Sequence, residues 1–137
     1  MSFLACDEFI DKSGKTLTID DLKKVTLYGV YLSAHWCPPC RDFTPVLADF
    51  YEEVKGQGLE IIFGSRDQDV ASFKDYFKTM PWIAFPFEAP QIEDIMDKYN
   101  VEGIPTLLIF KPDGTLITDK GVEDVDSKGP DALKKWL

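Results

Sequence analysis

Cysteine and histidine are scarce in this sequence. Its 137 residues include three cysteines, Cys6, Cys37 and Cys40, and a single histidine, His35. Three cysteines do not make the disulfide framework of a small secreted protein, and a chain this long with 45% hydrophobic residues can fold around one core without such a framework. A structural zinc site needs four ligands, and His35 is too near Cys37 in sequence to supply the distant second half of one. We therefore expect no metal and no other cofactor.

Basic residues are also few. The chain has 15 Lys and Arg against 24 Asp and Glu, a formal net charge of -9, and no cluster of basic residues. Because proteins bind nucleic acids mainly through contacts with phosphates, direct nucleic-acid binding is not expected. An acidic surface favours basic or neutral protein partners, although such a surface also serves simply to keep a protein soluble.

Long apolar runs and low-complexity segments are missing. No run approaches the roughly 18 apolar residues of a membrane span, so we expect no contact with a membrane. The first residues lack the basic start of a signal peptide, and a Cys-X-X-Cys pair outside a disulfide framework suits a reducing compartment. We expect a cytoplasmic protein, with the nucleus as a second compartment. No repeat or linker divides the chain, which predicts one domain over residues 1–137.

The sequence does contain short apolar runs typical of strands, and these alternate with segments whose apolar residues follow helical spacing. Val25 to Leu32 and Leu59 to Gly64 are short apolar runs typical of buried strands, and apolar residues at helical spacing lie between them from Phe43 to Val54. A strand, a helix and a second strand in this order predict parallel pairing of the two strands. Further strands are predicted at 106–110 and 115–118, further helices at 70–78, 92–99 and from Pro130 to the end, and a small hairpin at 9–19. The expected fold class is α/β, with a mixed sheet, helices on both of its faces and a small N-terminal β-hairpin.

Two cysteines separated by two prolines come directly after the first strand, in the sequence Trp36-Cys37-Pro38-Pro39-Cys40. A helix N-terminus has unpaired N–H groups and favours a thiolate, which is the attacking species in disulfide exchange. If Cys37 is the N-cap, Pro38 takes the first helical position, where its missing N–H costs nothing. The two prolines keep the turn rigid and the two sulfurs close. Since Cys40 lies one turn further in, we expect Cys37 to attack a partner disulfide and Cys40 to resolve the mixed disulfide.

The residues beside the motif allow more than one interpretation. Two cysteines at this spacing can also be half of a zinc site, but a second pair of ligands is missing. His35 is placed to carry a proton, or it is an ordinary surface residue. Trp36 is expected to be a rigid lid beside the thiol that contacts partners.

Three separated features make the chain resemble the thioredoxin superfamily. They are the Trp-Cys-Pro-Pro-Cys motif, Pro45 five residues after the second cysteine, and Gly103-Ile104-Pro105-Thr106 before a strand. The resemblance implies a thioredoxin fold, with a cis peptide bond before Pro105 and that proline facing the cysteines. It also implies that the backbone of Ile104 binds a substrate peptide in strand fashion, while Pro105 offers no competing N–H. The stretches YLSAHWCPPCRDFTP and YFKTMPWIAFPF are similar to the tryparedoxin and nucleoredoxin branch, over residues 25–122.

Two positions depart from patterns of the family. Ordinary thioredoxins carry a buried Asp six residues before the first cysteine, where it assists proton transfer from the second thiol, and this chain has Tyr31 there. The proton acceptor for Cys40 is therefore open, with water and a nearby carboxylate as alternatives. Tryparedoxins place a Trp where this chain has Arg66, which weakens the case for trypanothione as electron donor.

Cys6 has no partner within the chain if Cys37 and Cys40 pair with each other. An unpaired cysteine is either inert filler of the core or the link of a homodimer joined by a disulfide between two copies of Cys6.

The sequence thus predicts an enzyme, a thiol-disulfide oxidoreductase that reduces protein disulfides through Cys37 and Cys40. The alternative is a regulatory binding module whose redox state controls a partner, such as a signalling protein or a redox-sensitive transcription factor. A thioredoxin fold without redox turnover is the weakest interpretation, because both cysteines are present.

Overall fold

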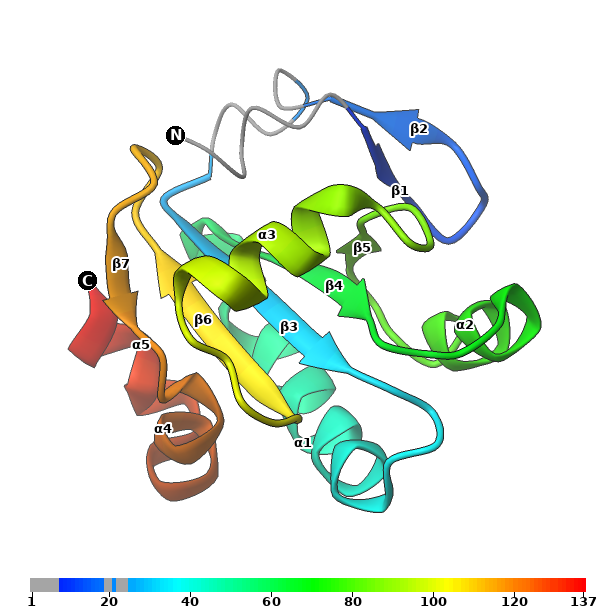
Figure 1. Ribbon diagram of the computed structural model, residues 1–137. Coiled ribbons are helices and arrows are strands. Elements are labelled where there is room, and N and C mark those ends of the chain that lie inside the picture. Colours follow the sequence, from blue (N-terminus) through cyan, green and yellow to red (C-terminus); the bar gives the residue numbers. More distant parts are fainter. Residues whose placement is uncertain (1–7, 19–20, 22–24) are drawn as a thin grey trace.

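One mixed sheet organises the protein. The computed structural model describes residues 8–18, 21 and 25–137. Within them, seven strands follow the order β2-β1-β5-β4-β3-β6-β7 (Figure 1). The strands are β1 (Phe9–Ile10), β2 (Thr16–Leu17), β3 (Leu27–Ser33), β4 (Leu59–Ser65), β5 (Ile83–Ala84), β6 (Thr106–Phe110) and β7 (Leu116–Thr118). The α-helices are α1 (Pro38–Val54), α2 (Val70–Phe77), α3 (Pro90–Lys98), α4 (Gly121–Lys128) and α5 (Ala132–Trp136), with short 3-10 helices at Lys55–Gln57 and Gly129–Asp131.

The centre of the sheet is the β3-α1-β4 unit that the sequence predicts. β3 pairs in parallel with β4 along its whole length, from Leu27 opposite Leu59 to Ser33 opposite Ser65, and its other edge pairs antiparallel with β6. After α1 the chain reverses at Gly58, whose φ of 97° is a conformation that glycine adopts without strain. Both central strands therefore end at the same edge of the sheet, where the two cysteines follow.

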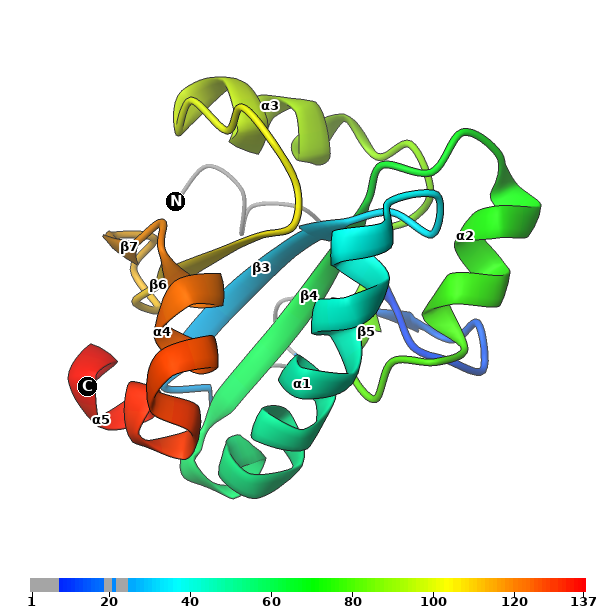
Figure 2. The same cartoon turned by 90° about the horizontal axis from the view of Figure 1, so that it is seen from below.

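Helices cover both faces of the sheet. Figure 2 shows α3 on one side and α1 and α4 on the other. Because neighbouring residues of a strand point to opposite faces, Tyr31 packs in the cluster beneath α1, while Val30 and Leu32 pack in the cluster that includes Ile92 and Ile95 of α3. Each helix thus buries its apolar stripe against one face of the same sheet.

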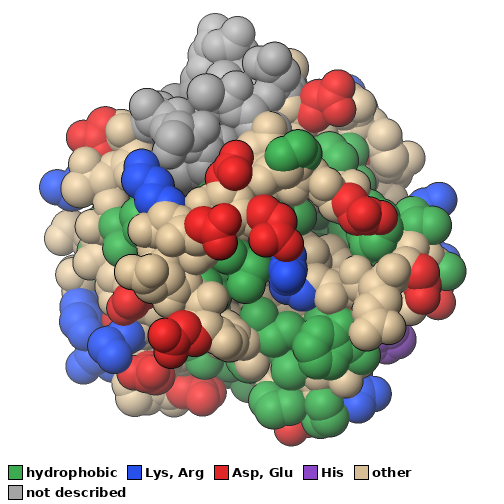
Figure 3. All heavy atoms as spheres, in the orientation of Figure 1, with side chains coloured by type: hydrophobic (Ala, Val, Ile, Leu, Met, Phe, Trp, Pro, Cys, Tyr) green, Lys and Arg blue, Asp and Glu red, His purple; other side chains and the backbone are tan. Residues whose placement is uncertain are grey.

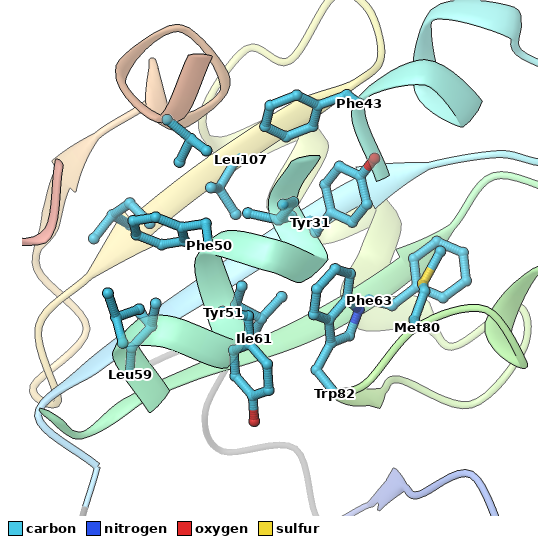
Figure 4. Packing of buried hydrophobic residues seen from close by; sticks show 14 of the residues in the cluster. Tyr31, Phe43, Phe50, Tyr51, Leu59, Ile61, Phe63, Met80, Trp82 and Leu107 are labelled. Atoms are coloured by element: carbon cyan, nitrogen blue, oxygen red, sulfur yellow. The ribbon is translucent and has the colours of Figure 1, made fainter. Parts of the chain in front are cut away.

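Aromatic rings fill the core beneath α1 and α2. Trp82 contacts Tyr31 and Tyr51 edge to face, with ring centroids 5.8 and 5.6 Å apart. Phe63 contacts Tyr31 and Tyr76. Figure 4 shows Tyr31, Phe63 and Trp82 among the side chains between the sheet and α1, with the Tyr31 hydroxyl pointing toward the N-terminal part of the helix. This packing holds α1, which begins at the cysteine motif, against the sheet.

The expected α/β architecture is confirmed, including helices on both faces and the N-terminal hairpin of β1 and β2. The predicted C-terminal helix is confirmed as the 3-10 turn at Gly129–Asp131 followed by α5, but the sequence did not predict the helix before it, α4. The sequence pattern missed α4 because few of its residues are apolar, and one of its buried residues is Asp124. Strand β5 was not predicted either.

Asp124 is held by partners that only the fold brings together. Its carboxylate accepts hydrogen bonds from Trp136 Nε1 and Lys135 Nζ, both at 3.0 Å. Burial works against the charged form, but these two hydrogen bonds and the positive charges of Lys135 and Lys128 together hold the pKa of Asp124 below its usual range. The carboxylate therefore ties α5 to α4.

We expect Asp124→Asn to lower the free energy of unfolding at pH 7 by about 1 to 3 kcal/mol, because the amide cannot accept both hydrogen bonds. A carboxyl whose pKa is lower in the folded state stabilises the fold at pH values above its pKa in the unfolded chain, which is about 3.9. This contribution is lost as the pH falls through the pKa of the folded state. The difference between parent and variant should therefore shrink below about pH 4. Urea unfolding at several pH values measures it, with the exposed Asp126→Asn as control. A difference independent of pH would contradict the assigned role.

Candidate active site

Cys37 lies at the N-terminus of α1, just beyond the carboxyl end of β3. Its backbone is extended, with φ −98° and ψ 109°, and prolines fill the first positions of the helix. Cys37 is therefore the N-cap, as the sequence predicted. Its Sγ atom lies 3.9 Å from the carbonyl oxygen of Ile104, and 6% of the residue is exposed. A small part of this residue is thus open to solvent.

Cys40 lies one turn further along α1 and is completely buried. Both cysteines are free thiols in this structure. Burial, together with the neighbouring Cys37 thiol, raises the pKa of Cys40 to about 11, although the Ser33 hydroxyl and the Ala34 backbone act in the opposite direction. At neutral pH the Cys40 thiol therefore keeps its proton.

Four buried hydroxyl groups surround the first turn of α1. They belong to Tyr31, Ser33, Thr44 and Tyr76, and we refer to them as the hydroxyl cluster. Thr44 Oγ1 donates to the carbonyl oxygen of Cys40 at 2.9 Å and lies 2.7 Å from the Tyr31 hydroxyl and 2.6 Å from the Tyr76 hydroxyl. Ser33 Oγ lies 2.6 Å from the Tyr76 hydroxyl. Burial raises the pKa of both tyrosines above the usual range, so their hydroxyls stay neutral.

The loop that carries the motif is fastened to the segment after β4. The Asp67 carboxylate accepts a hydrogen bond from the His35 backbone N–H at 2.7 Å and another from the Ser65 hydroxyl at 2.8 Å. The indole Nε1 of Trp36 donates to the carbonyl oxygen of Arg66 at 3.0 Å. The Trp36 ring is therefore fixed in direction although 55% of the residue is exposed.

A hydrophobic area surrounds the opening at Cys37. Figure 3 shows it over the loop between β3 and α1, while acidic side chains lie over α3. Trp36, Pro38 and Pro39 are exposed, and Ile104 and Pro105 are half-buried. The Ile104–Pro105 bond is cis, as the resemblance implied. The predicted contact residues for a substrate are thus available to solvent, and their binding role stays a prediction.

A groove of about 420 Å³ is lined by residues of α1 and α2. Its lining includes His35, Thr44 and Tyr76. The His35 ring stacks on the Tyr76 ring, with centroids 5.4 Å apart and planes 17° from parallel. His35 is therefore an exposed residue beside the hydroxyl cluster, and its use as a proton carrier stays a prediction.

Tyr31 and Arg66, the two residues that depart from the family pattern, both have polar contacts in the structure. The Tyr31 hydroxyl lies 3.4 Å from the carbonyl oxygen of Cys40, so it meets the backbone of α1. Arg66 forms an ion pair with Glu93 of α3, with 2.8 Å between Nη1 and Oε1. Cys6 lies outside the described residues, so the disulfide-linked homodimer stays a prediction.

Within residues 8–18, 21 and 25–137, no group of three or more His, Cys, Asp or Glu side chains is arranged to hold a metal ion. The described helices include none with the length and apolar character needed to cross a membrane.

Sequence reasoning missed most of the hydroxyl cluster. Thr44 carries a signal, because a residue four positions after Cys40 in a helix lies next to it. Ser33 also carries one, since it ends the strand that leads into the motif. Tyr76 carries no such sequence signal, because it lies on α2, which only the tertiary fold brings close to the cluster.

Comparisons with known proteins agree with this geometry. The sequence model of the family described as Thioredoxin-like matches residues 25–116. The tryparedoxin of Trypanosoma brucei brucei is 38% identical over 124 residues, which are 85% of this chain and 85% of that protein. The crystal structure of a thioredoxin from Wuchereria bancrofti superposes with a TM-score of 0.86 at 40% identity, covering 98% of this chain and 96% of that one.

The nucleoredoxins are similar over a part of their length. Probable nucleoredoxin 1 of Arabidopsis thaliana is 40% identical over 136 residues, which are 96% of this chain but only 23% of that protein. The chain therefore spans about a quarter of the nucleoredoxins it matches. Sheet order, helix placement and sequence likeness all lead to one assignment: the chain has the thioredoxin fold and belongs to the thioredoxin-like family of oxidoreductases, on the branch of the nucleoredoxins and tryparedoxins.

Proposed function

We propose that the chain is a protein-disulfide reductase in which Cys37 is the attacking thiol and Cys40 the resolving thiol. The observation that carries this proposal is the pairing of a partly open Cys37 at a helix N-cap with a fully buried Cys40 thiol one turn further along the same helix. A helix N-terminus favours the thiolate that attacks, and burial keeps the second thiol away from foreign disulfides.

The reaction balances in two exchange steps. The Cys37 thiolate attacks one sulfur of a substrate disulfide, forms a mixed disulfide and releases the other substrate sulfur as a thiolate, which takes up a proton. Cys40 then loses its proton and attacks Cys37 Sγ, which forms the Cys37–Cys40 disulfide and releases the second substrate thiolate. The substrate gains two electrons and two protons, and an external thiol reductant must restore the dithiol.

The proposed substrate is an extended peptide segment that carries a disulfide. The Ile104 backbone beside Cys37 Sγ offers hydrogen-bonding groups to such a segment, and Pro105 has no N–H that would compete. Trp36, with its ring direction fixed by Arg66, offers an apolar wall next to the sulfur. The proposed compartment is the cytoplasm, with the nucleus as a second one, because a reducing environment returns such a dithiol to its active form.

The test is to trap the mixed disulfide. Reduced Cys40→Ser should accumulate a covalent adduct with a protein disulfide substrate such as insulin, because the second attack is removed while the first is retained. On a non-reducing gel we expect at least about tenfold more adduct than with the parent, and dithiothreitol should cleave the adduct. Cys37→Ser is the matched control and should form none. Absence of adduct with Cys40→Ser, or equal adduct with Cys37→Ser, would contradict the proposal.

A second candidate function is a redox-dependent binding module for signalling proteins or transcription factors. It is favoured by the likeness to nucleoredoxins and by the net charge of -9, which suits basic partners. A partner captured equally by Cys37→Ser and by the parent would support binding without covalent exchange, whereas a partner captured only by Cys40→Ser would support the reductase.

A further inference from the structure

A second groove lies between the turn of the N-terminal hairpin and α2. It has a volume of about 280 Å³, and its lining combines apolar side chains with basic ones. Figure 2 shows the turn between β1 and β2 beside the end of α2. Among the described residues, its lining shares no member with the cysteine motif or with the groove beside His35. It is therefore a surface separate from the candidate active site.

Two stacked rings form the apolar part of this groove. Phe73 and Phe77 lie one turn apart on α2, with ring centroids 5.7 Å apart and planes 13° from parallel. They are 3% and 6% exposed, and the half-buried Ile10 of β1 joins them in the lining. Because both rings are already packed in the core, the groove keeps its shape without an occupant.

Three lysines line the same groove from two elements. Lys74 and Lys78 lie one turn apart at the end of α2, where the helix dipole favours cations, but Lys12 comes from the hairpin turn and belongs to no helix. Within the described part of the chain, no ion pair forms at Lys12 or Lys74. Lys78 meets Asp75 at 3.9 Å, and a pair this exposed binds weakly. The ammonium groups are therefore available to an outside anion.

The carboxylate in the described lining belongs to Asp11 and is used by the hairpin turn itself. Its Oδ1 atom accepts hydrogen bonds from the Ser13 N–H at 2.9 Å, the Ser13 hydroxyl at 2.6 Å and the Lys15 N–H at 3.0 Å. These bonds fix the turn that carries Lys12. Three lysines thus face one aspartate in the groove, whereas the whole chain has 15 Lys and Arg against 24 Asp and Glu. The local charge is opposite in sign to the net charge.

We propose that this groove docks a short acidic segment of a partner protein. We call it the lysine groove, defined by Lys12, Lys74, Lys78, Phe73 and Phe77. Carboxylates of the segment bind the three lysines, and one of its large apolar side chains lies on the stacked rings. The proposal goes beyond disulfide reduction, because an acidic partner is held on a surface that leaves the cysteine motif open.

A peptide segment suits the lysine groove better than an anionic membrane does. Surfaces that bind membranes present large apolar side chains outward, where they enter the lipid. Here the lysines are exposed, while the rings of Phe73 and Phe77 lie almost buried in the core. An occupant must therefore bring its own apolar side chain into the groove.

The test titrates the full chain, labelled with nitrogen-15, with a short peptide that is rich in Asp and Glu, carries one Trp and one Leu and lacks cysteine. At low salt we expect the amide signals of residues 10–15 and 70–78 to shift, with a Kd below about 0.5 mM. Lys12→Glu combined with Lys74→Glu should weaken binding by at least about tenfold. Lys111→Glu combined with Lys120→Glu changes the net charge equally at exposed positions elsewhere and should weaken it by less than about twofold.

Changes of the probe test the same contacts without altering the protein. A peptide with Ala in place of its Trp and Leu should bind at least about fivefold more weakly, because it cannot cover the rings. A peptide with Lys in place of its acidic residues should not shift these signals. Added salt should weaken binding of the acidic peptide, since the contacts with the lysines are exposed.

Three results would overturn the proposal. One is equal binding of the acidic peptide by the two charge-reversed variants, and another is a set of shifted signals outside residues 10–15 and 70–78. The third is tighter binding to vesicles of phosphatidylserine and phosphatidylcholine than to the peptide, lost with Lys12→Glu and Lys74→Glu, which would assign the lysine groove to a membrane. Because the peptide has no cysteine, these results do not depend on thiol exchange, and a failure of the reductase proposal leaves them unchanged.

Discussion

Replacing Cys37 by Ser should abolish disulfide reduction. We expect the rate of insulin reduction with dithiothreitol as donor to fall by on the order of a thousandfold or more, to the rate of dithiothreitol alone. The reason is that a serine hydroxyl is not ionised at neutral pH, whereas a thiol at a helix N-cap supplies the thiolate that starts the exchange. Initial rates of insulin precipitation measure the effect.

A thiol removed elsewhere in the chain provides the control for this experiment. Cys6→Ser has no place in the proposed exchange and should keep the parent's rate. Retention of more than about a tenth of the activity in Cys37→Ser would mean that another group attacks the substrate, and the assignment of Cys37 would be wrong.

Truncating Phe63 should cause the largest loss of stability. The ring is fully buried on β4 and contacts Phe73 and Phe77 of α2 as well as Tyr76, whose ring meets it edge to face at 5.5 Å. We expect Phe63→Ala to lower the free energy of unfolding by about 3 to 5 kcal/mol, because it removes a buried side chain and leaves a cavity. Urea unfolding of the reduced protein measures the loss.

Val70→Ala on α2 is the matched control for truncation. Val70 is 48% exposed, so the change should stay within about 0.5 kcal/mol. If Phe63→Ala cost less than about 1 kcal/mol, the packing between β4 and α2 would not be the support of the hydroxyl cluster that the structure indicates.

The elements predicted best from sequence are those with strong local signals. β6 occupies the predicted residues 106–110, and β3, β4 and α2 lie within two residues of expectation. Apolar runs and helical spacing predict such elements because each buries a continuous stripe. α4 was missed because its burial depends on Asp124, whose partners come from α5.

The same division holds for the candidate site. The N-cap position of Cys37 and the deeper place of Cys40 follow from two prolines at the start of a helix, which is local geometry. The hydrogen bonds that hold the motif loop do not follow from local geometry, since Asp67 and Arg66 contact the loop from the end of the neighbouring strand. The resemblance supplied the cis bond before Pro105, which spacing alone could not have shown.

By itself, the sequence determined the α/β class, the order of the central elements and the chemistry of two thiols one helical turn apart, because these depend on residues near each other along the chain. Only the tertiary structure decided what surrounds Cys40. Its hydroxyl neighbours come from β3, α1 and α2, and hydrogen bonds between segments more than thirty residues apart exist only once the sheet and its helices have packed.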